Sequence, residues 1–395
     1  MRIEMPKYME RVGGLRIFGV QKVLELTGGK SEGPNIGLPG IVNVSRGDLE
    51  DLESRMTIVV PVKNENPKVL EGVLSGIPHE SFVIIVSNST RNIIDHYRVE
   101  MDTVFHYYRL TRRPFVMVHQ RDPVLSDALP EAGYPYLIGN DGLVRNGKGE
   151  GMVLGLLLAK AIGREYVGFI DSDNYIPGAV NEYVDIYAAA FSMANSPYVM
   201  VRICWPYKTK FVGKRFYFRR RGRVSEITNK YMNLLLARVT RFESGVIKTS
   251  NAGEHAMTLK LAERIGYAGG FSIEPYELVY MLEEYSGVKK PRFMDVVKKT
   301  IEIYQVEPRN PHIHEERSDE HIPNMLKSSL STIYHSMLAD DELRKRIENE
   351  LIIRGALKPG ESIPEPRRLP IMKNVDAVKI LKLLESSSES FIYAE

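Results

Sequence analysis

Four short apolar runs, each bounded by polar or turn-forming residues, constrain most strongly what this chain can fold into. The runs are short and rich in β-branched residues, which is typical of buried strands. They read as continuous apolar segments rather than alternating ones, which indicates a mostly parallel sheet covered on both faces. The four predicted strands span 56–62, 82–87, 166–171 and 198–205.

The segments between these runs are long enough for the helical crossovers that parallel strands require. In one of them, Ile227, Tyr231 and Leu235 recur at helical spacing, so an apolar stripe would lie on one helix face. After about residue 275 the pattern changes to charged helical segments and a proline-rich stretch. We therefore expect an α/β domain over 1–275 and a mainly helical C-terminal region over 276–395. Helices are predicted at 151–163, 178–194, 225–240 and 254–265.

Composition narrows the class of protein. A hydrophobic fraction of 43% and a charged fraction of 26% are ordinary for a soluble globular chain, and 395 residues allow a sizeable core. The single cysteine, Cys204, excludes an internal disulfide and a thiolate metal cluster, and it suits a reducing compartment. The longest apolar stretch, 152–159, is far below the roughly 20 residues that span a bilayer. We expect a cytoplasmic protein with no membrane partner.

The strongest chemical signal is Asp171-Ser-Asp173, which closes the predicted strand 166–171. Ligands of open α/β sheets bind at the carboxyl ends of the strands. Two carboxylates separated by one residue can converge on a divalent cation there, and their hard oxygen atoms suit Mg²⁺ or Mn²⁺. The same three residues also fit a turn or a helix N-cap. Taken alone, the pattern leaves both interpretations open.

A glycine-rich segment at 144–151 contains Arg145 and Lys148 and leads directly into the predicted helix 151–163. Glycines allow close approach to a phosphate, a helix N-terminus offers unpaired N–H groups, and Lys148 adds a positive charge. The spacing is not that of a Walker loop, which removes the main support for an ATPase. A glycine-rich turn with solvated charges is the simpler alternative.

Two further strand ends complete the pattern. The strand 56–62 ends in Pro61-Val-Lys63-Asn-Glu65, and the strand 82–87 ends in Ser87-Asn88. Together with the glycine-rich segment and Asp171-Ser-Asp173, this order resembles GT-A-type glycosyltransferases, which use nucleotide sugars. The stretches Asn251-Ala-Gly-Glu254-His255 and Asn310-Pro-His312-Ile-His314-Glu315 sharpen the resemblance. Over nearly its whole length the chain resembles the mannosyl-3-phosphoglycerate synthase family.

This resemblance implies a GT-A-like fold with a twisted, mostly parallel sheet flanked by helices. It also implies transfer of mannose from GDP-mannose to D-3-phosphoglycerate with retention, a step toward the compatible solute mannosylglycerate. By the same resemblance, a Mg²⁺ or Mn²⁺ site would comprise Asp171, Asp173 and His312, with His314 as the alternative imidazole. Asp173 and Glu254 would act in catalysis. The residues expected to bind the donor are Pro61, Lys63, Glu65, Ser87, Asn88 and Lys148.

Glu254 also has a purely structural interpretation. Asn251 followed by Glu254 fits a helix capping box ahead of the stripe formed by Met257, Leu261 and Ile265. Under that interpretation Glu254 would stabilise the predicted helix 254–265 and take no part in catalysis.

Positive charge is concentrated at 208–223, where eight Lys and Arg residues occur with no acid. An acceptor carrying a phosphate and a carboxylate needs such cations, and Arg145, Arg215 and Arg219 are the candidates. Aromatic residues interleave the run, so a single-stranded RNA-binding module is a rival hypothesis. A sugar-phosphate nucleotidyltransferase is a third. The leading hypothesis involves no nucleic acid as partner, and it leaves the oligomeric state open, with a homodimer among the options.

Overall fold

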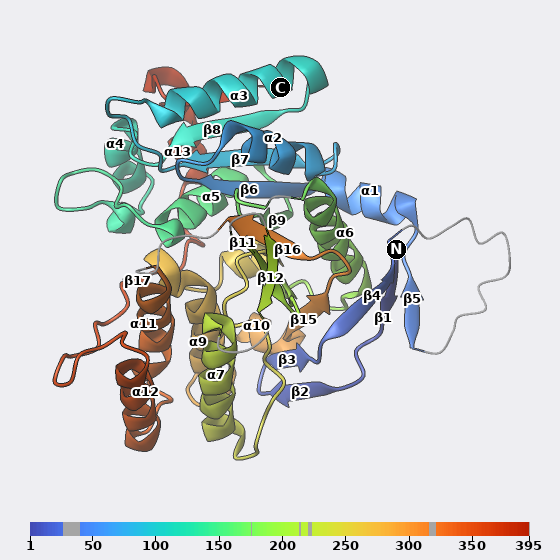
Figure 1. Ribbon diagram of the computed structural model, residues 1–395, viewed down its shortest axis with the longest axis vertical. Helices are drawn as coiled ribbons and strands as arrows, with labels where there is room; N and C mark the ends of the chain where they lie inside the picture. The colour runs from blue at the N-terminus through green and yellow to red at the C-terminus, as the bar shows by residue number, and fades with distance from the viewer. Residues whose placement is uncertain (27–39, 175, 213–214, 220–222, 316–320, 395) are drawn as a thin grey trace, which may run out of the picture.

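The computed structural model describes residues 1–26, 40–174, 176–212, 215–219, 223–315 and 321–394, except for the side chains of 208–212, 216–219, 314, 315 and 321. Most strands join one large sheet, in the order β18-β8-β7-β6-β9-β13-β10-β15-β4-β1-β5. In addition, β3 pairs with β15, and β2 pairs with β3. Figure 1 shows helices on both sides of this sheet. The predicted α/β architecture is confirmed. Over the described ranges, no helix combines the length and apolar character needed to cross a membrane.

The sheet has two parallel blocks separated by one antiparallel strand. Strands β8, β7, β6 and β9 are parallel, as are β10 and β15, and β13 runs antiparallel between β9 and β10. All four predicted strands are present, two of them slightly shorter than predicted. The central strands are β6 (Met56–Val62), β7 (Phe82–Ser87), β8 (Phe115–His119), β9 (Tyr166–Phe169), β13 (His255–Thr258), β10 (Val199–Ile203) and β15 (Ile301–Glu307).

Burial on both faces explains the continuous apolar runs. In β6, Val59 belongs to the hydrophobic cluster that includes α5 (Lys148–Ile162), whereas Ile58 and Val60 belong to the cluster on the opposite face. Because neither face of the strand meets water, both sets of alternate side chains are apolar. The opposite face is covered by α1 (Arg46–Ser54), α2 (Pro67–Gly76), α3 (His96–Thr111) and α6 (Pro177–Met193).

The antiparallel direction of β13 matters for the site. His255, its first residue, pairs with Phe169 at the end of β9 and with Arg202 near the end of β10. The residues just before β13 therefore lie at the same edge of the sheet as those just after β9. Glu254 and Asp171 are brought to one edge in this way.

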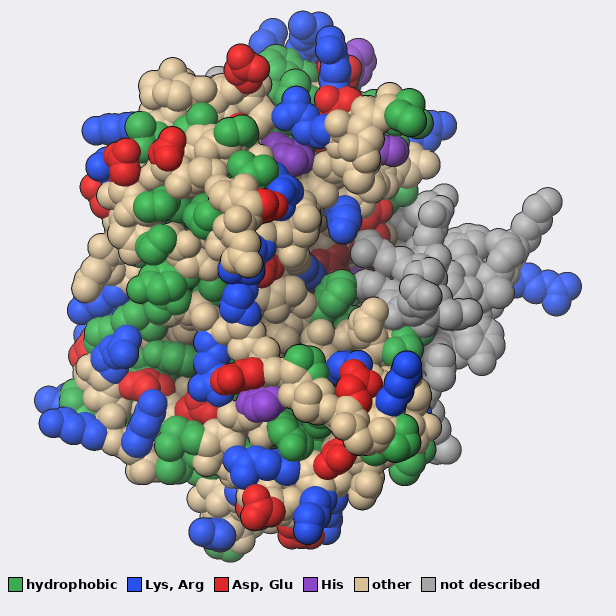
Figure 2. Space-filling view, turned by 90° about the vertical axis from the view of Figure 1, so that its left-hand side faces the viewer, with side chains coloured by type: hydrophobic (Ala, Val, Ile, Leu, Met, Phe, Trp, Pro, Cys, Tyr) green, Lys and Arg blue, Asp and Glu red, His purple; other side chains and the backbone are tan. Residues whose placement is uncertain are grey.

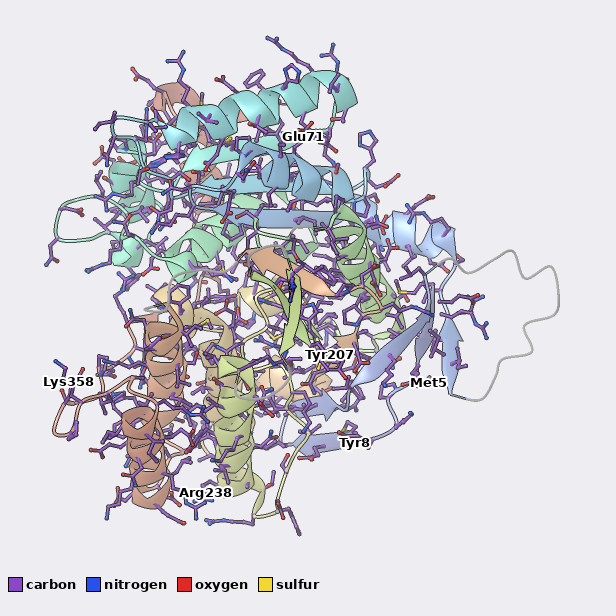
Figure 3. The ribbon with its side chains drawn as sticks, in the orientation of Figure 1. Met5, Tyr8, Glu71, Tyr207, Arg238 and Lys358 are labelled. Atoms are coloured by element: carbon purple, nitrogen blue, oxygen red, sulfur yellow. The ribbon has the colours of Figure 1, made fainter. Side chains whose placement is uncertain are left out.

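The C-terminal region is mainly helical, as predicted, and also contributes strands to the large sheet. β15 pairs with β10 inside the sheet, and β18 (Phe391–Ala394) pairs with β8 at its edge. The predicted division at residue 275 falls within α9 (Ile273–Tyr285). Figure 3 shows Arg238 near the lower end of α7 (Val224–Thr240), where its Nε lies 2.9 Å from Asp340 Oδ2 at the N-cap of α12 (Asp341–Ile353). Helix α11 (His321–Tyr334) packs on α7, α9 and α12.

One predicted helix is wrong. The segment 254–265 forms strand β13 and only a short helix, α8 (Leu259–Ala262), capped by Thr258. Pairing of β13 with strands on both sides outweighs the helical spacing of its apolar residues. The other three predicted helices correspond to α5, α6 and α7.

The remaining elements lie around this framework. The N-terminal strands, which were not predicted, extend the sheet beyond β15. They are β1 (Arg2–Glu4), β2 (Met9–Val12), β3 (Leu15–Phe18), β4 (Gln21–Glu25) and β5 (Ile41–Asn43). The others are α4 (Val124–Glu131), α10 (Met294–Lys299), α13 (Ala377–Ser387), the small sheet of β11 (Lys208–Val212), β12 (Arg215–Arg219) and β16 (His312–Glu315), and the pair β14 (Tyr267–Ala268) and β17 (Arg368–Leu369).

Candidate active site

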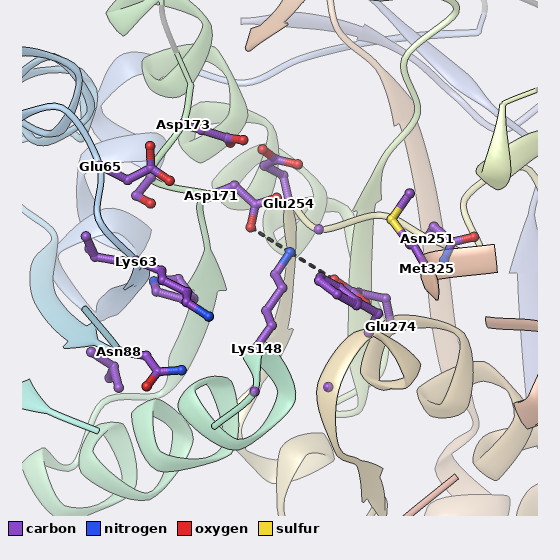
Figure 4. A pocket seen from close by; sticks show the side chains of 18 of the residues that line it. Lys63, Glu65, Asn88, Lys148, Asp171, Asp173, Asn251, Glu254, Glu274 and Met325 are labelled. Atoms are coloured by element: carbon purple, nitrogen blue, oxygen red, sulfur yellow. Dashed lines mark ion pairs between the residues drawn. The ribbon is translucent and has the colours of Figure 1, made fainter. Parts of the chain in front are cut away.

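A cavity of about 470 Å³ opens at the edge where β6, β7 and β9 end and β13 begins. Side chains from distant parts of the chain meet in it, and Figure 4 shows Lys148 between Asp171 and Glu274. The lining residues that carry the argument are Pro61, Lys63, Glu65, Asn88, Lys148, Asp171, Asp173, Arg223, Asn251, Glu254, Glu274 and His312.

Lys148 occupies the centre of the cavity wall at the first turn of α5. Its Nζ lies 2.7 Å from Asp171 Oδ1 and 3.0 Å from Glu274 Oε1, the two ion pairs dashed in Figure 4. Burial alone would lower the pKa of Lys148, but the two carboxylates outweigh burial and raise this pKa above its ordinary value. The side chain is therefore a permanent positive charge.

Two glycines permit the close approach of the segments around Lys148. A Cβ on Gly253 would lie 2.5 Å from Asp171 Oδ2 and 3.0 Å from Lys148 Nζ. A Cβ on Gly149 would lie 2.4 Å from the carbonyl oxygen of Ala268. Gly149 belongs to the segment that was predicted to let a phosphate approach. In the structure it lets the start of α5 pack against the backbone of residues 268–270.

Glu254 is buried, with about 1% of its surface exposed, directly before β13. Its Oε1 accepts a hydrogen bond of 2.8 Å from Asn174 Nδ2. Asn251 donates instead to Ser329 Oγ, at 2.7 Å. The capping-box interpretation of Asn251 and Glu254 is therefore wrong, because neither side chain caps a helix and a strand follows.

Asn174 connects three parts of the site. Its Nδ2 also donates to the carbonyl oxygen of Asp171, at 2.9 Å, and its Oδ1 lies 3.0 Å from His312 Nδ1. The His312 ring lies over Trp205, with ring centroids 4.6 Å apart. The indole is held in turn by a 3.0 Å hydrogen bond from its Nε1 to the hydroxyl of Tyr183. His312 is thus fixed both in position and in orientation.

The three predicted metal ligands, Asp171, Asp173 and His312, all line this cavity. Two carboxylates and an imidazole suit Mg²⁺ or Mn²⁺, so the donor set fits a divalent ion in its chemistry. Among the described side chains, no group of three or more His, Cys, Asp and Glu residues is already arranged around a metal position. The side chain of His314 lies outside the described residues.

Four of the predicted donor-binding residues before α5 line the cavity: Pro61, Lys63, Glu65 and Asn88. Ser87 differs: it is fully buried, and its Oγ donates to Glu100 Oε2 at 2.6 Å. Ser89 Oγ donates to the other Glu100 oxygen at 2.5 Å and accepts from the backbone N–H of Asn64 at 2.7 Å. Ser87 therefore belongs to a buried network that supports the loops after β6 and β7, behind the cavity wall.

The predicted acceptor arginines are not brought together. Arg145 Nε donates to the carbonyl of Ile138 at 3.2 Å, and Arg145 is not among the residues lining the cavity. Arg215 is exposed at the start of β12, and the side chain of Arg219 lies outside the described residues. Arg223, the last cation of the basic run, lines the cavity as the N-cap residue of α7. In the sequence, Arg223 directly precedes the amphipathic helix predicted at 225–240. That position could have distinguished it from the other cations of the run.

Sequence reasoning also missed Asn174, whose place directly after Asp171-Ser-Asp173 was the available signal, and Glu274, which has no local motif to mark it. On the face shown in Figure 2, basic and acidic side chains are interspersed over the described surface. The basic run itself gives no test of the RNA-binding alternative there, because most of its side chains lie outside the described residues.

Comparison with known proteins places this geometry in context. The chain is 47% identical over 393 residues to the mannosyl-3-phosphoglycerate synthase of Pyrococcus furiosus, with 99% of both chains covered. It is 42% identical over 396 residues to the enzyme of the same name from Aeropyrum pernix, with 100% of both covered. A solved structure of glucosyl-3-phosphoglycerate synthase from Mycobacterium tuberculosis, in complex with uridine diphosphate, is similar at 18% identity and a TM-score of 0.49, covering 76% of this chain and 87% of that one.

A family profile described as "Mannosyl-3-phosphoglycerate synthase (osmo_MPGsynth)" matches residues 5–384. The match spans nearly the whole chain, including every residue of the cavity wall. The chain therefore belongs to the mannosyl-3-phosphoglycerate synthase family.

Proposed function

We propose that this protein transfers mannose from GDP-mannose to D-3-phosphoglycerate with retention at the anomeric carbon, in the presence of Mg²⁺ or Mn²⁺. The observation that carries the proposal is the convergence of Asp171, Asp173, Glu254 and His312 on one cavity at the carboxyl edge of the sheet. Family membership supplies the substrate class. The cavity supplies the groups that such a transfer needs.

The nucleotide would bind along the ends of β6 and β7. Lys63, Glu65 and Asn88 line that side of the cavity and offer donors and acceptors to a base and ribose. In Figure 4, Lys148 lies beside Lys63 and Asn88 and points to Asp171, and its charge could neutralise a diphosphate bound there. To reach the diphosphate, the ammonium would exchange part of its contact with Asp171 for phosphate oxygens.

The metal would be held by Asp171, Asp173 and His312. A divalent ion bound there would supply positive charge to the diphosphate as the bond to mannose breaks. Lys148 adds to the same stabilisation from the N-terminus of α5, where the helix dipole also favours negative charge. Asp171 would then be a ligand of the metal and, at the same time, the ion-pair partner of Lys148.

As the sugar bond breaks, positive charge develops on the mannose ring. Glu254 is a buried carboxylate that lines the same cavity, so it is the group placed to stabilise that charge or to orient the acceptor. Its hydrogen bond from Asn174 holds one oxygen in place.

The acceptor carries a phosphate and a carboxylate and needs positive charge. Arg223 is the arginine that lines the cavity within the described chain, and we propose it for this role beside the predicted Arg215 and Arg219. Its planar guanidinium suits either anionic group.

Incubation with sugar nucleotides tests the proposal. Purified protein with GDP-mannose, D-3-phosphoglycerate and Mn²⁺ or Mg²⁺ should yield GDP and a mannosylated phosphoacid, and chelation of the metal should stop product formation. GDP-glucose and UDP-glucose, offered in parallel, test the donor preference. Absence of product with every sugar nucleotide would overturn the proposal.

A further inference from the structure

Asn174 makes contacts that go beyond a turn residue following Asp171-Ser-Asp173. Only about 1% of its surface is exposed, and its amide touches three segments that are far apart in sequence. Nδ2 lies 2.8 Å from Glu254 Oε1 and 2.9 Å from the carbonyl oxygen of Asp171, and Oδ1 lies 3.0 Å from His312 Nδ1.

These contacts determine which way the amide points. Glu254 as a carboxylate and the Asp171 carbonyl are both acceptors, so the group facing them must be the NH₂ of Asn174. The reverse orientation would place the amide oxygen against two acceptors and leave two buried hydrogens facing the His312 ring. Both N–H groups of Asn174 are therefore used, and its oxygen faces His312.

The oxygen in turn determines the His312 tautomer. An amide oxygen can only accept, so Nδ1 of His312 must carry the proton. Glu254 Oε1, a second acceptor, lies 3.7 Å from the same nitrogen and favours the same assignment. The neutral ring then has its lone pair on Nε2. The ring packs against Trp205, with centroids 4.6 Å apart, so both rings keep to one place in the cavity wall.

We propose that Asn174 is a positioning residue that fixes His312 in the Nδ1–H tautomer and thereby reserves Nε2 for the divalent metal. This inference rests on the metal site of the proposed function. Histidine ligands commonly donate their second ring N–H to a fixed acceptor, and loss of that partner typically weakens metal affinity about 10–100-fold. Because the amide of Asn174 contacts both side chains, it also links the proposed metal ligand His312 to Glu254.

The tautomer can be read directly, without metal or substrate. Long-range ¹H–¹⁵N NMR of the ¹⁵N-histidine-labelled full chain at pH 8, with His312 assigned through a His312→Gln variant, should show the Nδ1–H form in the wild type. Asn174→Ala should shift the ring toward the Nε2–H form or a mixture. Asn174→Asp keeps an acceptor and should retain Nδ1–H. An Nε2–H ring in the wild type would overturn the proposal, and that result does not depend on whether the Asn174 variants fold.

Metal affinity is the second readout. Mn²⁺ titration followed by electron paramagnetic resonance should give a Kd raised about 10–100-fold in Asn174→Ala. Asn233→Ala is the matched control, because Asn233 is also a buried amide, with Nδ2 donating 2.8 Å hydrogen bonds to the carbonyls of Asn229 and Ile247, outside the cavity wall. It should lose stability and keep the wild-type Kd. An unchanged Kd in Asn174→Ala would contradict the proposal.

The two proposals fail in distinguishable ways. If wild-type protein transfers mannose and binds Mn²⁺, but Asn174→Ala changes neither the tautomer nor the Kd, only the role of Asn174 is wrong. If wild-type protein forms no product with any sugar nucleotide, the proposed function fails, whatever tautomer His312 adopts.

Discussion

The ammonium of Lys148 lies 2.7 Å from Asp171 Oδ1, so one ion pair joins the start of α5 to the residues that follow β9. The same ammonium reaches Glu274 in the first turn of α9, at 3.0 Å. A single cation therefore connects the first turn of α5, the segment after β9 and the first turn of α9. The three segments meet only because the fold brings them to one edge.

Replacing Lys148 should separate its role at the site from its role in stability. In Lys148→Met, the carboxylates of Asp171 and Glu274 would face each other without a cation, which costs about 1–3 kcal/mol. Loss of a charge aimed at the diphosphate should also lower kcat by roughly 10²–10³. Urea unfolding and initial-rate kinetics measure the two effects.

Lys160→Met is the matched control on the same helix. Lys160 Nζ lies 2.7 Å from Glu263 Oε1 with similar exposure, but Lys160 does not line the cavity. We expect a comparable loss of stability and wild-type kinetics. Equal kinetic effects in the two variants would show that Lys148 acts only through the fold.

Glu254→Gln should abolish most of the activity while leaving the fold intact. The glutamine oxygen can still accept the hydrogen bond from Asn174, so unfolding by urea should change little. The lost negative charge should lower kcat about 10²-fold or more if it stabilises charge on the sugar. The control is Glu302→Gln, since Glu302 is equally buried but pairs with Arg16 at 3.2 Å, outside the cavity. Full activity in Glu254→Gln would assign Glu254 a structural role.

The network behind the donor side predicts an effect on substrate binding. Glu100 accepts the hydroxyls of Ser87 and Ser89, and Ser89 holds the backbone of Asn64. Glu100→Ala should loosen the loop that carries Lys63 and Glu65. We expect KM for the nucleotide sugar to rise about 10-fold, with a smaller change in kcat, because the reacting groups lie elsewhere.

Asp122→Ala provides the comparison for this network. Asp122 also accepts two serine hydroxyls, from Ser388 and Ser390, but it holds the C-terminal segment instead of a donor loop. Its loss should lower stability and leave KM unchanged. A similar rise of KM in both variants would remove the specific link between Glu100 and the donor.

A buried carboxylate far from the site should make stability depend on pH. Burial, followed by the neighbouring Asp185, raises the pKa of Glu53 to about 8, and Arg46 NH2 lies 3.6 Å from its Oε2. Between its ordinary pKa and about 8, the folded state holds a proton that the unfolded state has lost. Glu53 therefore lowers the free energy of unfolding more and more as pH rises through this window, and its effect is constant above the window.

Glu53→Gln should remove this dependence. At pH 8 the variant should be more stable than wild type by on the order of 2 kcal/mol, and the difference should shrink toward pH 5. Urea unfolding from pH 5 to 8.5 checks the trend. Glu71→Gln, on the exposed side of α2, should track the wild type at every pH. A stability difference independent of pH would contradict the assignment.

The elements that could be predicted from sequence are those with a local cause. Strands β6 and β7 match their apolar runs from end to end, because burial on both faces makes the pattern continuous. Asp171 and Asp173 could be located because they end such a run. Their position at the carboxyl edge of the sheet then follows, because parallel strands all end at that edge.

The failures have non-local causes. Met257, Leu261 and Ile265 are all fully buried at helical spacing, yet the first lies in a strand that two neighbours pair with. Ser87 faces Glu100 across the interior, a contact that no strand pattern encodes. The link from Asn174 to His312 joins residues 138 apart, and only the folded chain reveals it.

The central claim is that the acidic side chains after β9 hold a metal against the nucleotide diphosphate. A crystal grown with GDP and Mn²⁺, with diffraction recorded at the manganese absorption edge, tests it most directly. We expect an anomalous peak coordinated by the Asp171 and Asp173 carboxylates and by Nε2 of His312, in contact with the diphosphate. An empty corner with the nucleotide bound elsewhere, or a metal bound through His312 Nδ1, would contradict it.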